Sequence, residues 1–406
     1  MLYGIDFLRK KLANKKARVD TRYRYYEMKN GVENFGSILP DKAKYLAETL
    51  GWCAKAVDSV ADRIIFDKFS NDNFRIGEIF ELNNSDILFD SATLSALISS
   101  CSFIYLALDG GYPRMQVIDG GNATGIIDPV TNLLTEGYAV LERNENGGIT
   151  KEAYFEPYKT SFYIDGKLDE SLTQTHRAPY AMLVPIIYRP DARRPFGHSR
   201  ISRACIGIMQ SALRTLIRSE VSAEFYSFPQ KYILGLSEDA AFNNRLASLS
   251  DFLDIRKDED GDKPVVGQFS QQSMAPHLEQ LRSFASLFAG ETGLTLDDLG
   301  FAGANPTSFE AIKASHESLR LTTKKAQRTF GTGFLNAGYL AACLRDDMEY
   351  ERRAFAKTKA QYLPIFEPDT AALGATGDAI YKINQAVPDF IGRETIHQLT
   401  GLEGDT

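Results

Sequence analysis

The chain has 406 residues, of which 44% are hydrophobic and 24% charged, a composition typical of a globular protein with two or more packing units. The longest apolar run, Ala181–Tyr188, is far shorter than the roughly 20 residues that cross a bilayer, and the N-terminus shows no apolar signal segment, so we expect no membrane partner. Four scattered cysteines without a C-x-x-C pair argue against a disulfide framework or zinc site, and a net charge of −7 does not favour a dedicated DNA-affinity protein, which is usually basic.

The first 36 residues are strongly basic at their start. Eight cations fall within sixteen residues: Arg9, Lys10, Lys11, Lys15, Lys16, Arg18, Arg22 and Arg24. We favour a solvated helix face over a nucleic-acid patch for them. A helix is predicted over Leu39–Ile64, with Trp52 in its packed surface, and another over Asp90–Ser100.

The sequence then changes to short alternating segments separated by Asp-Gly-Gly, Asn-Gly-Gly and Asp-Gly turns. These turn signals at regular spacing predict an antiparallel β unit of about 80 residues. The strands are expected at Phe103–Leu108, Arg114–Ile118, Gly125–Ile127, Tyr138–Arg143 and Ala153–Ile164. Ala181–Tyr188 is predicted as a last strand, which leads into a proline-rich link.

Two long helices follow, with a shorter-ranged segment between them. The first is expected over Ser199–Phe228 and the second from Pro276 to about Ala289, each with an apolar stripe at helical spacing. Within the intervening segment we predict strands at Lys231–Leu234 and Pro264–Phe269 and a helix at Glu238–Leu249. The acidic stretch Asp258–Asp262 lacks the alternating carboxylates of a calcium loop, so a solvated turn is favoured over a metal site.

A glycine-rich loop, Gly293–Pro306, precedes a proline-free stretch that predicts one very long helix over Ser308–Leu344. One face of this helix is apolar, and another carries Lys313, Arg320, Lys324 and Arg328. Its three late glycines, at 331, 333 and 338, indicate close backbone approach or a kink. Helices over Asp369–Ala386 and Pro388–Thr400 complete the chain.

The usual signatures of catalysis are missing from the sequence. No Walker-type G-x-x-x-x-G-K-[ST], G-x-S-x-G, H-E-x-x-H or zinc-deaminase pattern occurs, and the five histidines lie far apart. Asp297 and Asp298 are adjacent on a loop, which does not make a held acid/base pair. We therefore predict a protein that is not an enzyme and that holds no cofactor or metal.

The order of the segments resembles the portal proteins of tailed bacteriophages, most closely those of phages with long non-contractile tails. The resemblance rests on Gly197-His-Ser-Arg-Ile201 opening the first long helix and Phe269-Ser-Gln-Gln-Ser273 leading into the second. The pair Tyr25-Tyr26 before Asn30-Gly31 adds to it. It implies an α+β portal fold with an α/β wing, a two-helix stem, a small α/β clip, a tunnel loop, a long wing helix and a short helical crown.

The portal segments carry over onto this chain in order. They are the wing at 1–199, the first stem helix at 200–228, the clip at 229–274, the second stem helix at 275–292, the tunnel loop at 293–307, the long wing helix at 308–346 and the crown at 347–406. The loop residues expected to line a DNA channel are Leu296, Asp297, Asp298, Leu299, Gly300, Phe301, Ala302, Gly303, Ala304 and Asn305. The basic face of the long helix is a possible belt beside them.

The resemblance implies a dodecameric ring at one capsid vertex of the virion, assembled in the host bacterial cytoplasm. The ring would serve as the channel for packaging and ejecting double-stranded DNA, contacted independently of its sequence. Its implied protein partners are the terminase large subunit, the major capsid and scaffold proteins, and the head–tail adaptor. On this interpretation Asp297 and Asp298 keep contact with the phosphate backbone transient; otherwise they form a solvated turn.

Two other functions remain open from the sequence alone. One is a metal-dependent enzyme that processes nucleic acid, which would need a carboxylate cluster and a divalent ion that the sequence does not display. The other is a different virion adaptor or assembly protein, which the number of copies and their place in the particle would distinguish.

Overall fold

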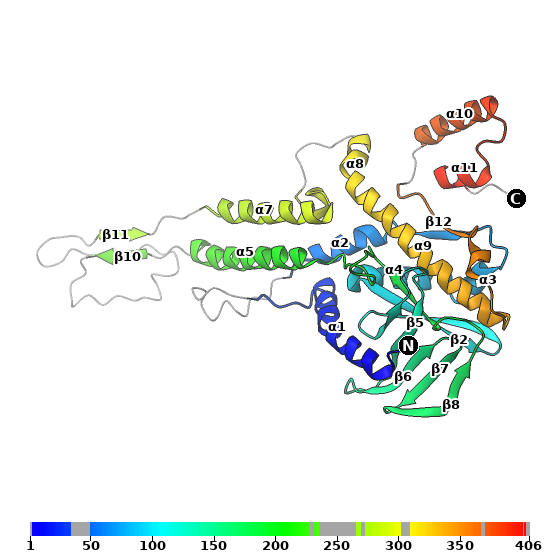
Figure 1. The fold of residues 1–406 in the computed structure, drawn as a ribbon. Helices are drawn as coiled ribbons and strands as arrows, with labels where there is room; N and C mark the ends of the chain where they lie inside the picture. The colour runs from blue at the N-terminus through cyan, green and yellow to red at the C-terminus, as the bar shows by residue number, and fades with distance from the viewer. Residues whose placement is uncertain are drawn as a thin grey trace, which may run out of the picture. The chain divides into compact units, whose positions relative to one another are not determined.

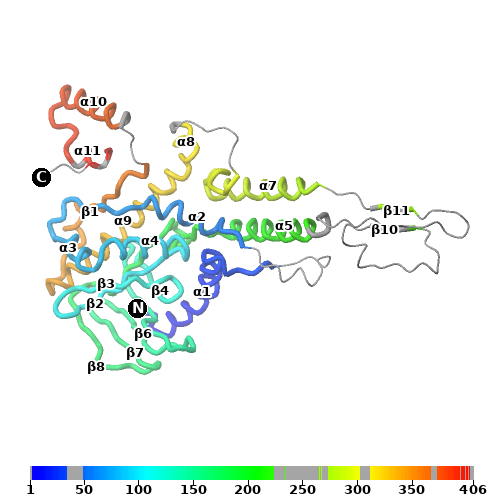
Figure 2. The backbone as a smooth tube through the Cα atoms, turned by 180° about the vertical axis from the view of Figure 1, so that it is seen from behind, coloured from blue at the N-terminus to red at the C-terminus, as the bar shows by residue number. Residues whose placement is uncertain are grey.

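The computed structural model describes residues 2–33, 49–227, 231–234, 265–268, 273–301, 309–366, 370–400 and 402. The chain divides into two compact units. Unit 1 comprises Met1–Asn30, Gly51–Ile206 and Gly290–Thr406, and unit 2 comprises Gly31–Leu50 and Gly207–Ala289. Figures 1 and 2 show helices and strands mixed throughout unit 1, whereas the described part of unit 2 consists of long helices and a strand pair.

Unit 1 contains two larger antiparallel sheets. The three-stranded sheet has the order β3-β2-β9, and the five-stranded sheet runs β4-β5-β6-β7-β8 without a crossover. Their bounds are β2 (Cys101–Asp109), β3 (Tyr112–Ile118), β4 (Ala123–Ile127), β5 (Leu134–Arg143), β6 (Ile149–Glu156), β7 (Lys159–Ile164), β8 (Lys167–Thr175) and β9 (Leu183–Ile187). The prediction of one strand over Ala153–Ile164 is wrong, because a turn at Tyr158, with φ 65°, folds this segment into β6 and β7. The sequence did not predict β8.

The pairing register shows how the two sheets pack. Directly paired residues of neighbouring strands point to the same face, and Tyr105 of β2 pairs with Leu183 of β9. Tyr105 lies against Phe155 of the five-stranded sheet, with ring centroids 5.3 Å apart, and Leu183 lies so close to Gly137 that a Cβ there would be 3.1 Å from its Cδ2. This face of the three-stranded sheet therefore packs on the five-stranded sheet.

The opposite face of the three-stranded sheet carries helices. Ser102 and Ile186 pair across β2 and β9; the Ser102 hydroxyl donates to a carbonyl of α4 (Ser85–Ser99), and Ile186 lies against α9 (Glu317–Arg345). The two helices meet through Phe89 and Phe334, whose ring centroids are 4.4 Å apart. Phe66 stacks on Phe89 at 3.8 Å and extends this aromatic core.

Phe66 belongs to a strand pair that the sequence did not predict. It comes from β1 (Phe66–Ser70), which pairs antiparallel with β12 (Lys359–Tyr362). Three short elements complete this region: α2 (Trp52–Ala61), α3 (Ile76–Glu81) and η3 (Arg352–Phe355). The expected Leu39–Ile64 helix is shorter than predicted, because 49–51 are not helical and α2 ends at Ala61; residues 39–48 lie outside the described residues.

The glycines of α9 allow close packing, as the sequence predicted. A Cβ on Gly333 would lie 2.7 Å from Ile186 Cδ1 and 3.1 Å from the Pro185 carbonyl oxygen, and one on Gly338 would lie 2.8 Å from Ile76 Cδ1. The missing side chains therefore let the helix approach β9 and α3 closely, which offsets the cost of about 1 kcal/mol for each helical glycine.

Helix α1 (Ile5–Tyr26) covers the outer face of the five-stranded sheet. Leu8 and Leu12 pack with Tyr138, Val140 and Tyr154 in a buried cluster. Two buried carboxylates of the same face fix the helix. The Glu136 carboxylate accepts hydrogen bonds from the Tyr3 and Gly4 N–H groups at 2.7 and 2.9 Å. The Glu152 carboxylate accepts hydrogen bonds from the Arg9 guanidinium and the Tyr138 hydroxyl. A carboxylate at the start of a helix also favours the helix dipole.

Unit 2 is built on α5 (Arg203–Ser227) and α7 (Ala275–Thr292), which continue into it from unit 1. The two helices are joined by a hydrogen bond of 3.2 Å from Thr215 Oγ1 to Gln280 Oε1. Gln210 also holds the segment that follows Asn30, because its amide contacts the Gly31 carbonyl oxygen and the Glu33 N–H. Strands β10 (Lys231–Leu234) and β11 (Val265–Gln268) pair antiparallel. The predicted helix Glu238–Leu249 lies outside the described residues.

The C-terminal part differs from the sequence prediction in two places. The single helix expected over Ser308–Leu344 is interrupted at His316, so α8 (Phe309–Ser315) precedes α9. The Ser315 hydroxyl and a ring nitrogen of His316 both bond to the Ile312 carbonyl oxygen, in competition with the helical hydrogen bond. Helix α10 (Thr370–Ala386) closely follows the expected range, whereas α11 (Arg393–Thr400) begins later than Pro388.

Candidate functional site

The glycine-rich loop begins where α7 ends, and its described half is folded rather than extended. Gly293 and Gly300 adopt left-handed φ angles of 70° and 89°, and the 3-10 turn η2 (Asp297–Leu299) lies between them. Leu299 is buried, and Phe301 packs edge-on against Trp52 of α2 with ring centroids 6.5 Å apart. Trp52 is thus a packing residue, as expected. Of the ten predicted channel residues, 296–301 are described and 302–305 lie outside the described residues.

Two contacts join the first part of the loop to the residues at the start of α9. A Cβ on Gly293 would lie 2.8 Å from the Ser318 hydroxyl oxygen, so the start of the loop touches the first turn of α9. A second contact follows a few residues later in the loop, where Oδ2 of Asp298 lies 3.1 Å from Nε2 of His316. We call this set of contacts the loop base, with Gly293 and Asp298 on one side and His316 and Ser318 on the other.

Asp298 is held by more than the histidine. Its Oδ2 accepts the Thr295 N–H and hydroxyl, each at 2.9 Å, and its own N–H donates to Thr295 Oγ1 at 3.2 Å. This is the reciprocal pattern of a capping box. Burial alone would raise the pKa of Asp298, but the hydrogen bonds from Thr295 and His316 outweigh it and lower this pKa below its ordinary value.

The two adjacent aspartates therefore differ. The Asp298 side chain is 19% exposed and is engaged in the loop base, whereas Asp297 is exposed. The sequence alone presented them as one acidic feature and gave no sign that His316 contacts the loop. The Thr295-x-x-Asp298 spacing is the signal that could have separated the two, because it matches a capping box.

The two long helices are also tied together where they enter unit 1. Arg200 is 7% exposed; its Nε donates to the Ala56 carbonyl oxygen at 3.0 Å, and its terminal nitrogen donates to the Thr292 carbonyl oxygen at the end of α7. The Ser202 hydroxyl donates to Glu291 Oε1 at 2.8 Å. A guanidinium at a helix C-terminus satisfies carbonyls that have no helical partner. Arg200 thus joins the start of α5, the end of α7 and α2.

The four residues of the predicted basic belt differ in their exposure, their ion pairing and the helix that carries them. Arg320 forms a two-pronged ion pair with Glu317, with both nitrogen–oxygen distances 2.7 Å, and this pairing raises the pKa of Arg320. Lys324 and Arg328 are exposed on α9, one helical turn apart, whereas Lys313 lies on α8 before the interruption at His316. Lys324 and Arg328 thus offer the exposed positive charge on this face.

No helix in the described ranges is both long and apolar enough to span a membrane. Within those same ranges, no three histidine, cysteine, aspartate or glutamate side chains gather in a way that could hold a metal ion. All four cysteines are buried and free.

The described residues form a mixed α/β protein in which Ser202, just before α5, bonds to Glu291 near the end of α7. Residues 5–351 match the model of the family described as phage portal protein, SPP1 Gp6-like, and the chain belongs to this family. Portal proteins are structural components of the bacteriophage virion, which confirms both the resemblance and the expectation that the chain is not an enzyme.

Two relatives are similar over most of the chain. The portal protein of Mycobacterium phage L5 is 25% identical over 348 residues, and that of Mycobacterium phage D29 is 24% identical over 348; each comparison covers 78% of this chain and 69% of the relative. Among solved structures, a chain of the native gene transfer agent virion has a TM-score of 0.48 at 13% identity, covering 95% of this chain and 100% of that one. A chain from the neck of the native particle, computed with C12 symmetry, has a TM-score of 0.46 at 11% identity, covering 87% and 90%.

Proposed function

We propose that copies of this chain, twelve in the virion as the family resemblance implies, close into a ring at one capsid vertex. Double-stranded DNA enters and leaves along the axis of this ring. The terminase large subunit docks on it during packaging and the head–tail adaptor afterwards, and the capsid and scaffold proteins surround it. The ring assembles in the host cytoplasm. Membership of the portal family supports this assignment most directly, and a ring closed by rotation uses one head-to-tail interface repeatedly.

We infer that the loop between α7 and α8 lines the channel. The Gly293–Ser318 contact and the Asp298–His316 pair support this role, because they fix the first part of the loop against the start of α9 in unit 1. DNA contacts here are to phosphates and independent of sequence. The exposed Asp297 repels passing phosphates and keeps such contacts brief, and Lys324 and Arg328 offset that repulsion from α9.

The experiment that tests the loop assignment is Asp297→Lys in a DNA-packaging assay, with ring formation followed separately. We expect rings to form normally and packaging or DNA retention to fall. Asp298 is left unchanged, because its replacement would also break the loop base. Glu145→Lys is the matched control: it makes the same charge change on an exposed turn between β5 and β6 and should package normally. Normal packaging by Asp297→Lys would remove the electrostatic role of the loop.

A further inference from the structure

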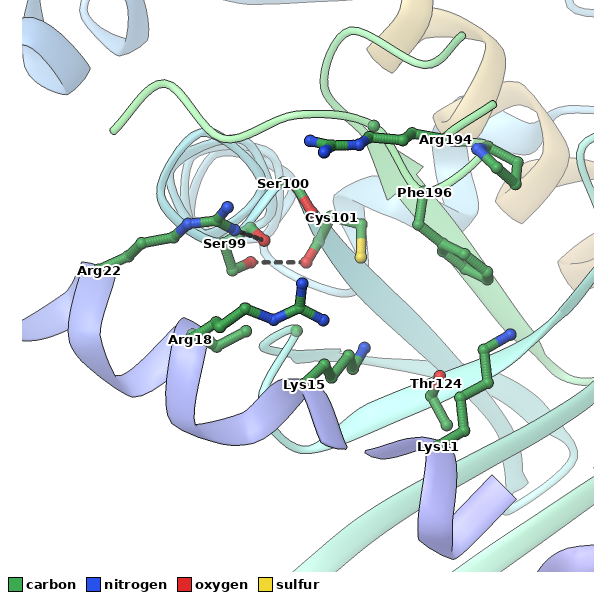
Figure 3. Close-up of a pocket in the computed structure, with 14 residues that line it drawn as sticks. Lys11, Lys15, Arg18, Arg22, Ser99, Ser100, Cys101, Thr124, Arg194 and Phe196 are labelled. Atoms are coloured by element: carbon green, nitrogen blue, oxygen red, sulfur yellow. Dashed lines mark hydrogen bonds between the residues drawn. The ribbon is translucent and has the colours of Figure 1, made fainter. Parts of the chain in front are cut away.

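A strongly basic pocket lies in unit 1, away from the loop. It has a volume of about 290 Å³ and is enclosed by α1, the junction of α4 and β2, the turn at Gly120, the start of β4, and the link after β9. Figure 3 shows Lys11, Lys15, Arg18 and Arg22 on α1 beneath this space and Arg194 on its far side. The basic face of α1, which the sequence analysis took for a solvated surface, thus forms one wall of a pocket.

The lining contains five cations and no carboxylate. Its other members are small, aliphatic or aromatic, with the polar groups supplied by Ser99, Ser100, Cys101 and Thr124. Within the described ranges, none of the five cations has a carboxylate within ion-pair distance, although Arg9 and Lys16 of the same helix do. The positive charge is therefore concentrated on one side of α1 without matching negative charge.

Neutral backbone groups hold three of these cations in place. Lys11 Nζ donates to the Gly125 carbonyl oxygen at 2.7 Å, Lys15 Nζ to that of Ala123 at 2.5 Å, and Arg22 to that of Ser99 at 3.0 Å. Carbonyl oxygens orient an ammonium or guanidinium group but do not neutralise it. The exposed Arg18 and Arg194 have longer reach and more freedom at the rim. The pocket thus has fixed inner charges and movable outer ones.

Holding these buried cations close together without a bound anion costs electrostatic free energy. Burial lowers the pKa of Lys11, Lys15 and Arg22, and neighbouring cations lower each of them further. The Asp119 carboxylate, whose charge partly opposes this fall in the pKa of Lys15, does not line the pocket; it accepts the Gly121 N–H and the Asn122 amide, each at 2.6 Å.

Two backbone positions at the pocket, Gly120 and Ser100, also have unusual local geometry. A Cβ on Gly120 would lie 2.5 Å from the Cys101 carbonyl oxygen and 2.8 Å from Ser99 Oγ, so only glycine fits there without a shift. Ser100, the C-cap residue of α4, has a φ of 87°, a conformation that ends the helix at the wall of the pocket.

We propose that this pocket binds a compact phosphate-type anion, of which pyrophosphate is the simplest example. Five cations around about 290 Å³ call for several negative charges close together, and a single carboxylate supplies one. Arginine forks and lysine ammonium groups are the side chains that bind phosphate oxygens most often. A DNA backbone spreads its charges along the helix and would meet the rim, Arg18 and Arg194, rather than the inner lysines. These points favour the compact anion over DNA.

The test is isothermal titration of pyrophosphate into the full chain, in a phosphate-free buffer at constant ionic strength, with a DNA duplex titrated in parallel. We expect one saturable site per chain. The rim variant Arg18→Gln/Arg194→Gln should weaken pyrophosphate binding by about tenfold or more, since it removes two charge-assisted contacts. Lys10→Gln is the matched control; Lys10 is exposed on α1 and does not line the pocket, so binding should stay within about twofold.

A second variant, Lys15→Met, tests the inner charge and should reduce binding at least as strongly as the rim variant. If it fails to fold, the rim variant alone decides, because its two side chains are exposed. The proposal is overturned by no saturable binding at about 1 mM pyrophosphate, by equal binding to wild type and rim variant, or by binding of the duplex without pyrophosphate.

Discussion

Replacing Asp298 by Asn tests how the loop base is held. The carboxylate Oδ2 accepts bonds from the Thr295 N–H, the Thr295 hydroxyl and His316 Nε2. An asparagine oxygen in the place of Oδ2 can accept the same bonds but carries no charge, so the bonds from Thr295 weaken. Its NH₂ group takes the place of Oδ1, which lies 3.3 Å from His316 Nε2. The main loss is the charge-assisted hydrogen bond to the histidine, worth about 1.5–3 kcal/mol. We expect the low end, about 1.5 kcal/mol, because the two side chains are 19% and 13% exposed.

The stabilisation by the Asp298 carboxylate should depend on pH in a definite direction. The pKa of Asp298 is lowered in the folded protein, so the carboxylate stabilises the fold above the ordinary aspartate pKa of about 3.9, and that stabilisation is lost as pH falls through the lowered pKa. The difference between wild type and Asp298→Asn should therefore be present at about pH 6 and shrink as the pH falls below about 4.

The assay is thermal unfolding combined with hydrogen exchange at the Thr295 amide, which the carboxylate protects. Glu145→Gln, on an exposed turn, removes one carboxylate elsewhere and should change stability by less than about 0.5 kcal/mol. Unchanged stability and unchanged exchange at Thr295 in Asp298→Asn would show that the loop base does not depend on this carboxylate.

Three further changes have definite expected outcomes. Arg200→Met should cost about 2–4 kcal/mol in thermal unfolding, because it removes a charged hydrogen-bond donor from the carbonyl oxygens of Ala56 and Thr292. Gly333→Ala should cost about 1–3 kcal/mol, because its Cβ would press on Ile186. The His397 ring donates to the Leu402 carbonyl oxygen and lies 2.9 Å from Asp67, and these two contacts raise the pKa of His397. That stabilisation is lost as pH rises through the raised pKa, so the hydrogen-exchange protection factors of α11, which correct for intrinsic exchange, should fall between about pH 6 and 8.

Each of these has its own control. Gly207→Ala adds a Cβ to a helix where nothing lies within 4 Å, and in the isolated chain it should stabilise by about 0.5–1 kcal/mol. A loss comparable to that of Gly333→Ala would mean that close packing is not the cause. Arg203→Met removes an exposed arginine near Arg200 and should be nearly neutral. His397→Gln should abolish the pH dependence of the α11 protection factors; if that dependence persists, another group controls it.

Local patterns predicted the elements that depend on local signals. Apolar periodicity and the absence of proline located α5 and α7 to within a few residues, and glycine turns located most strands of the two sheets. The glycines of α9 were interpreted correctly, because a helix tolerates them only for a packing reason. The split at Tyr158 was missed, since Pro157-Tyr158 carries a weaker turn signal than an Asp-Gly pair.

Other features depend on residues far apart in the chain. Strand β1 pairs with β12 nearly three hundred residues later, and short strands with such distant partners have no local signature. Glu136 and Glu152 look like solvent-facing residues of ordinary strands, yet α1 buries them. The basic pocket combines one face of α1 with Arg194, and sequence alone cannot show that a charged helix face turns toward a protein wall.

The central claim is that this portal-family chain closes into a ring with a channel for DNA. Electron microscopy of the purified chain, with native mass measured on the same sample, tests it most directly. We expect rings with a central hole wide enough for duplex DNA and a mass near twelve times 45.2 kDa. A monomer or dimer that persists at high concentration and forms no ring even with its capsid partners would contradict it.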